Sequence, residues 1–154
     1  MTYTSYFLPI SAKGVVFDNN KVWLRKNERR EWELPGGKVD EGEQPCETVE
    51  RELREELGFV TRVRRVAHAH IYVIPNSIDE SKGVLVLSFL CDLIGKAGDR
   101  EHEGEAGSAK FECFSIEEVM HLNMPSFYRD AILQARDIGI FMQNDRINSP
   151  LTNI

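Results

Sequence analysis

The chain has 154 residues, of which 42% are hydrophobic and 29% charged, so it can form one domain with a sizeable core and is not disordered throughout. Its net charge of −6, without a run of lysines and arginines, argues against a nucleic-acid partner. It has no apolar run long enough to cross a bilayer and no secretory signal, so we expect a cytoplasmic protein with no membrane partner.

The first part of the chain predicts a β-hairpin. Residues 5–17 are mainly apolar or small and predict a strand, Asp18-Asn19-Asn20 is a turn signal, and KVWLRK (21–26) predicts a second strand, so that 14–26 forms the hairpin. The segment WELPGGKVDEGE (32–43) carries one proline and three glycines, and we therefore expect a loop there.

Residues 44–57 give the clearest helical pattern. Pro45 suits the first helical position, and Gly58 suits the residue just past the end. An apolar stripe should face the sheet; it comprises Cys46, Val49, Leu53 and Leu57.

The remainder predicts further strands and two helices. Strands are expected at 59–74, at 83–94, which should be central, and at 109–114, with a polar loop over 95–108. Ser115 followed by two glutamates is typical of a helix start, and a C-terminal helix is expected over 124–141. The expected organisation is one α/β domain over residues 1–141 with a mixed sheet, followed by a frayed tail at 142–154.

Three glutamates on the predicted helix 44–57 share one face. Glu52, Glu55 and Glu56 are spaced i, i+3 and i+4, at the rim of the stripe that packs on the sheet. Most glutamate-rich helix faces are simply solvated, which is the ordinary alternative. A hard cation such as Mg²⁺ prefers oxygen ligands and takes one or two carboxylates together with substrate phosphates.

The surrounding spacing favours the cation. The segment from Gly37 to Phe59, GKVDEGEQPCETVERELREELGF, fits the pattern G-x5-E-x7-R-E-U-x-E-E-x-G-U, in which U is a bulky apolar residue. This pattern resembles the Nudix box, and the chain resembles Nudix hydrolases. WELPGG before the helix and KFECFSIEEV after it are also similar to family segments, which extends the resemblance to about residues 5–140.

The resemblance implies a Nudix-type α/β/α sandwich and a function. Carboxylates at Glu52, Glu55 and Glu56, with a backbone carbonyl near Gly37, would bind Mg²⁺ or Mn²⁺, and Glu43 and Arg51 would form a supporting ion pair. The implied reaction is hydrolysis of a nucleoside diphosphate linked to another group X, by a monomer or homodimer acting on a small-molecule nucleotide. The alternative is a catalytically silent nucleotide-binding or sensor module with the same fold.

The general base is left open between two places. Glu52 itself is one candidate. The other is a glutamate of the later loop or the next strand, and the candidates there are Glu101, Glu103, Glu105, which we select, and Glu112.

Three further residues are predicted to contact the substrate. Arg25 would bind phosphate, Trp32 would stack on a base, and His70 would line the pocket. Each has an ordinary alternative, namely an exposed edge arginine, a packed tryptophan and a partly exposed histidine.

Overall fold

The computed structural model describes residues 4–73, 82–97 and 110–148. Its elements, in chain order, are β1 (Ile10–Asp18), β2 (Lys21–Lys26), β3 (Trp32–Glu33), β4 (Gly36–Lys38), α1 (Pro45–Leu57), β5 (Phe59–Val73), β6 (Gly83–Lys96), β7 (Lys110–Ser115), α2 (Ile116–Val119) and α3 (Ser126–Asn148). None of the helices within these ranges is long and apolar enough to span a membrane.

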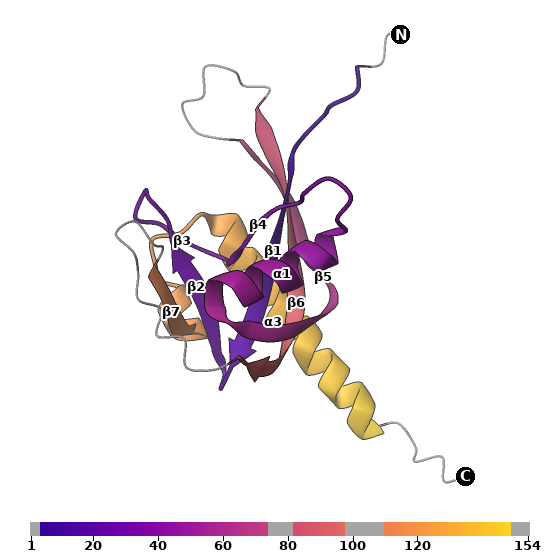
Figure 1. Cartoon of the computed structure of the whole chain (residues 1–154). Coiled ribbons are helices and arrows are strands. Elements are labelled where there is room, and N and C mark those ends of the chain that lie inside the picture. The colour runs from indigo at the N-terminus through magenta and orange to yellow at the C-terminus, as the bar shows by residue number, and fades with distance from the viewer. Residues whose placement is uncertain (1–3, 74–81, 98–109, 149–154) are drawn as a thin grey trace, which may run out of the picture.

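The strands form one mixed sheet in the order β3-β2-β1-β6-β5, with β4 paired to β1 and β7 paired to β2 (Figure 1). β1 and β6 are parallel, and the other pairs are antiparallel. The predicted hairpin is confirmed, since β1 and β2 pair around a turn in which Asn19 and Asn20 have φ of 49° and 62°. Asparagine tolerates this left-handed conformation better than most residues.

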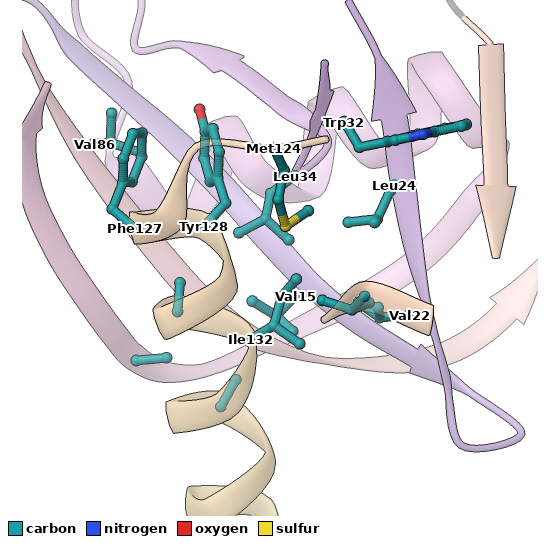
Figure 2. Close-up of a cluster of buried hydrophobic side chains, with 14 of the residues drawn as sticks. Val15, Val22, Leu24, Trp32, Leu34, Val86, Met124, Phe127, Tyr128 and Ile132 are labelled. Carbon is teal, nitrogen blue, oxygen red and sulfur yellow. The ribbon is translucent and has the colours of Figure 1, made fainter. Parts of the chain in front are cut away.

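A helix covers each face of the sheet, which gives the predicted α/β/α sandwich. Ala12 and Val16 of β1 pack with α1, whereas Val15 between them packs with α3, because successive side chains of a strand point to opposite faces. Figure 2 shows Val15 and Ile132 meeting in the core beneath α3. The two faces of the sheet therefore carry separate apolar clusters.

α1 has the predicted bounds and caps. Pro45 is its first residue, Gln44 and Glu47 form a capping box, and Gly58 ends the helix with φ 67°. One detail of the predicted stripe is wrong: Cys46 is exposed, and Thr48 is buried instead. Cys46 lies in the first turn, whereas the Thr48 hydroxyl is satisfied by the Glu43 carboxylate and can therefore be buried.

The segment 32–43, predicted to be a loop, contains the short strands β3 and β4. β4 forms because Gly36 and Gly37 have no side chains and can lie against β1, where Gly37 pairs with Ala12. Gly36 has φ +139°, and a methyl group on it would collide with the backbone of Ala12 and Lys13. The last helix also differs from its prediction, since α3 continues to Asn148 rather than ending at 141.

Candidate active site

Gly37, the second glycine of β4, lets a carboxylate of α1 lie against the strand. A methyl group added to Gly37 would collide with the side chain of Glu52, so the missing side chain is what makes room for that carboxylate. On the β1 side, the Ser11 hydroxyl lies 3.5 Å from the Gly37 carbonyl oxygen. Gly37 and Glu52, predicted to act together, are therefore neighbours across the α1–β4 contact.

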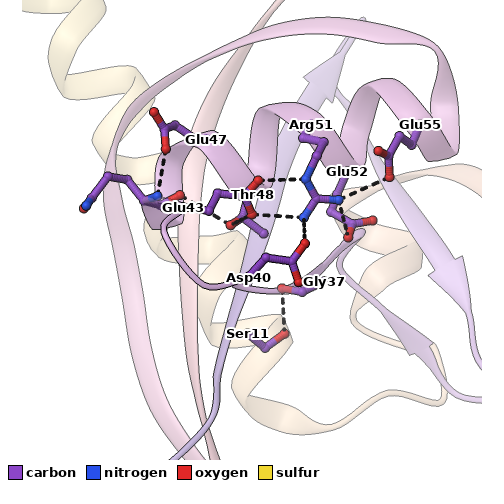
Figure 3. Close-up of polar contacts among 10 residues, drawn as sticks. Ser11, Gly37, Asp40, Glu43, Glu47, Thr48, Arg51, Glu52 and Glu55 are labelled. Atoms are coloured by element: carbon purple, nitrogen blue, oxygen red, sulfur yellow. Dashed lines mark hydrogen bonds and ion pairs between the residues drawn. The ribbon is translucent and has the colours of Figure 1, made fainter.

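Arg51 joins the preceding loop to α1 (Figure 3). Its Nε lies 2.8 Å from Oε2 of Glu43, and its Nη2 lies 3.0 Å from Oε1. This bidentate contact suits the planar guanidinium group. Arg51, and after it the Thr48 hydroxyl, lower the pKa of Glu43 to about 2. The loop is thus fixed to the helix by a carboxylate that stays ionised.

The same guanidinium contacts three more carboxylates. Its Nη1 lies 3.1 Å from Glu52 and 3.2 Å from Glu55, and its Nη2 lies 3.4 Å from Asp40. Glu55 is the more exposed member of the predicted metal set, with 59% of its side chain accessible against 19% for Glu52. Arg51 therefore supplies positive charge to the carboxylate face.

Glu56 is the unusual carboxylate of this face. Its Oε2 is buried and has no hydrogen-bond partner among the described residues. Burial, reinforced by the negative charge of Glu52, raises the pKa of Glu56 to about 7, although Lys13 and Arg25 act in the opposite direction. A buried acceptor without a donor is costly, and a cation beside it would remove that cost.

The donor set fits a hard divalent cation, although it is not closed around one. Within the described ranges, no three acidic, histidine or cysteine side chains converge on a single point. The contacts explain this, because Glu52 and Glu55 each direct an oxygen to Arg51. With the unpartnered oxygen of Glu56 and the carbonyl of Gly37 nearby, the available ligands are all oxygens, as Mg²⁺ and Mn²⁺ prefer.

The predicted substrate contacts have different surroundings. Arg25 binds Glu33 at 2.6 Å and Glu28 at 3.3 Å, and 22% of its side chain is accessible. Trp32 packs in the core against Phe114, with 7% of its surface exposed, which assigns it a structural position and leaves almost none of its ring for a base.

The other predicted residues have partners outside the carboxylate face or lie outside the described ranges. His70 is exposed on β5 and stacks on Phe127 with ring centres 4.4 Å apart. Glu112 on β7 is paired with Lys110 at 2.7 Å. The loop glutamates lie outside the described residues; they are Glu101, Glu103 and Glu105.

Lys13 is a site neighbour that the sequence analysis did not select. It is 7% exposed, and its positive charge acts on Glu56. The available signal was a lysine inside the otherwise small and apolar stretch ISAKGVVF, at a position whose neighbours are buried. Burial of a lysine depends on the elements that pack over it, which no local pattern specifies.

Comparison with known proteins decides the family. The model of the NUDIX domain matches residues 8–135, which is most of the chain. The chain belongs to the Nudix family. A NUDIX hydrolase structure from Nitrosomonas europaea has the same fold, with a TM-score of 0.70 at 16% identity, covering 85% of this chain and 90% of that one.

Two relatives show the range of activities attached to similar sequences. An ADP-ribose pyrophosphatase from Methanocaldococcus jannaschii is 33% identical over 111 residues, covering 67% of this chain and 64% of the relative. An 8-oxo-dGTP diphosphatase from Buchnera aphidicola subsp. Schizaphis graminum is 35% identical over 64 residues, covering 38% of this chain and 45% of the relative. This Nudix chain thus spans less than two thirds of the length of either relative.

Proposed function

We propose that this Nudix protein is a hydrolase that uses a divalent metal ion, Mg²⁺ or Mn²⁺, to cleave the pyrophosphate linkage of a nucleoside diphosphate joined to a group X. The observation that carries the proposal is the buried, unpartnered oxygen of Glu56 beside Glu52, on a helix face held against Gly37. An ordinary solvated helix surface would not leave a buried acceptor unsatisfied.

In this function Glu52, Glu55 and Glu56 hold the ion together with the Gly37 carbonyl, and Glu43 with Arg51 keeps the loop in place. When bound, a divalent cation neutralises pyrophosphate oxygens and makes a water molecule more acidic. Glu52 is our first candidate for the base that accepts the proton of that water. Glu105 remains the second candidate for this base.

A small-molecule nucleotide is the expected substrate class. The named relatives act on ADP-ribose and on 8-oxo-dGTP, which share a diphosphate attached to a nucleoside and differ in the base and in X. This common part is what we propose for the present chain, and those two compounds belong in the first substrate panel.

The experiment is a panel assay for released phosphate, pyrophosphate and nucleotide with Mg²⁺ or Mn²⁺. We expect turnover of at least one compound, no turnover with a chelator, and a loss of about 100-fold or more in Glu56→Gln, as for other charge-stabilising groups. Glu117→Gln, an exposed glutamate of α2, is the matched control and should keep full activity. Nucleotide binding without any turnover by the wild type would instead support the silent binding module.

A further inference from the structure

A pocket of about 310 Å³ lies on the face of the sheet that α3 covers. It combines three basic side chains with three aromatic ones, and a single carboxylate. Its lining residues are Ser11, Lys13, Arg29, Glu33, Lys38, Tyr72, Val84, Val86, Pro125, Phe127 and Tyr128. Rings with a few placed charges are typical of sites that orient a small molecule.

The register of the sheet sets the pocket beside the carboxylate face. Ser11 pairs with Lys38 on one side and with Val86 on the other, so these three side chains form one row across the sheet. Lys38 directly follows Gly37, whose carbonyl is near Ser11. A ligand that extends past Gly37 would therefore enter the pocket at its basic side.

Lys13 lies at this border, near the Glu33 carboxylate of the pocket and with its charge also acting on Glu56. Only 7% of its surface is exposed, and the one ion pair it makes within the described ranges is with Glu33, at 3.8 Å. The same Glu33 oxygen binds Arg25 at 2.6 Å, so that carboxylate is already engaged. A buried charge is stable only when it is paired, and an anionic ligand oxygen would complete the pairing of Lys13.

The aromatic residues of the pocket pack on one another. Phe127 is 6% exposed, because its ring contacts His70 at 4.4 Å, Tyr128 at 4.2 Å and Tyr72 at 5.3 Å. Tyr72 is the partly exposed ring of this group. Figure 2 shows Phe127 and Tyr128 side by side at the start of α3, with Val86 next to Phe127. Packed rings of this kind hold a planar ligand ring with little loss of their own freedom.

We propose that Lys13 is a specificity-determining residue, whose buried ammonium binds an anionic phosphate oxygen of the substrate while the nucleobase lies against the partly exposed ring of Tyr72. The inference rests on the proposed function and deepens it. It assigns the α3-side pocket to the nucleoside monophosphate part of the substrate, and it makes the sugar or phosphate of X the part that points away from α3.

The test measures binding without metal and therefore does not depend on turnover. With the full chain in a chelating buffer, we would titrate the four common nucleoside 5′-monophosphates, the matching nucleosides and inorganic phosphate by calorimetry. At least one monophosphate should bind about tenfold or more tightly than its nucleoside and than phosphate, because a charge-assisted hydrogen bond adds to ring stacking.

Variants separate the two contacts. Lys13→Met should remove the preference for the monophosphate over the nucleoside and leave nucleoside binding unchanged, while Lys13→Arg should restore part of the preference. Tyr72→Leu should weaken binding of both ligands. Lys21→Met, an exposed lysine at the start of β2, is the matched control and should change neither. Circular dichroism and thermal unfolding establish that each variant is folded.

Two results would overturn the assignment while leaving the hydrolase proposal intact. One is a folded Lys13→Met protein that still prefers the monophosphate as strongly as the wild type does. The other is a wild type that hydrolyses a nucleotide yet binds none of the monophosphates more tightly than inorganic phosphate. Inertness of the wild type in the panel assay, with the Lys13-dependent preference present, would overturn the hydrolysis and not the pocket assignment.

Discussion

At the scale of single residues, Glu56 differs from the other glutamates of α1 because one of its carboxylate oxygens is buried without a partner and the charge of Glu52 acts on it. Burial and the charge of Glu52 raise its pKa from 4.5 to about 7, whereas Arg51 lowers the pKa of Glu43 to about 2. Glu43 and Glu56, which lie nine residues before and four residues after Glu52, thus have opposite preferences for the proton. The first can brace a loop as a permanent anion, and the second can bind a cation or a proton.

Glu56 should make the metal-free protein less stable as pH rises. A carboxyl group whose folded pKa is raised favours the folded state when protonated, so its contribution is complete below about pH 4.5 and is lost by about pH 7. Glutamine resembles the protonated form. Glu56→Gln should therefore leave urea-unfolding stability almost unchanged near pH 4 and increase it near pH 8, both with a chelator present. An equal effect at both values would contradict the raised pKa.

Gly36 and Gly37 should respond differently to the same substitution. A methyl group at Gly36 meets backbone atoms of β1 at a positive φ, so Gly36→Ala should lower the free energy of unfolding markedly. At Gly37 it meets the end of the flexible Glu52 side chain, so Gly37→Ala should keep most of the stability and weaken Mn²⁺ binding. Chemical denaturation and Mn²⁺ titration of both variants test this contrast. Similar losses of stability in both would show that Gly37 is mainly structural.

At the scale of elements, the site depends on how firmly the loop before α1 is attached to the helix. Arg51 makes this attachment through Glu43, and its Nη1 also contacts Glu52 and Glu55. A bound cation would compete with Arg51 for the last two carboxylates and leave the Glu43 pair in place. The arrangement gives the carboxylate face a positive partner in the absence of metal.

Weakening this attachment should reduce metal affinity. Lysine cannot reproduce the bidentate contact with Glu43. Arg51→Lys should therefore lower Mn²⁺ affinity by about 10–100-fold, the range typical of groups that orient metal ligands. Glu43→Gln should have an effect of similar size. Arg54→Lys, an exposed arginine of the same helix, should have none. Mn²⁺ binding followed by electron paramagnetic resonance measures all three, and unchanged affinity in Arg51→Lys would remove the bracing role.

The elements that the sequence predicts best are those with local signals. α1 begins at Pro45 and ends at Gly58 as expected, because both residues act on their own backbone. β4 was missed, since its glycines are turn-forming residues and become a strand only because β1 lies beside them. The burial of Lys13 was missed for the same reason, and the roles assigned to Arg25 and Glu105 remain predictions.

At the scale of the whole molecule, the two long helices, α1 and α3, depend on one sheet. α1 packs on one face and α3 on the other, and β1 and β6 lie between them in the middle of the strand order. Loss of packing on either face should therefore weaken the support of the other. The carboxylate face is on α1, and the α3-side pocket is on the other face of the sheet, so both depend on this support.

Truncation on the α3 side should destabilise the entire domain. Ile132 is fully buried, and Ile132→Ala should cost about 2–5 kcal/mol in the free energy of unfolding, as should Leu53→Ala on α1. Ile140→Ala on the exposed part of α3 is the control, expected within about 0.5 kcal/mol of the wild type. Urea unfolding followed by both circular dichroism and tryptophan fluorescence should give coincident transitions. Separate transitions would show that the two faces unfold independently.

The alternation of β1 has a consequence for engineering this protein. Ser11 and Lys13 belong to the pocket, whereas Ala12 and Val16 pack under α1, where a methyl group on Gly14 would crowd Leu53 and Val49. Ser11 and Lys13 can therefore be varied in a library to change which nucleotide is selected, while Val15 is kept for the core under α3 and the even-numbered positions are kept for the helix that carries the carboxylates. A single residue inserted in β1 would turn the side chains that face α1 toward α3 and the reverse, and would disrupt both the pocket and the packing of α1.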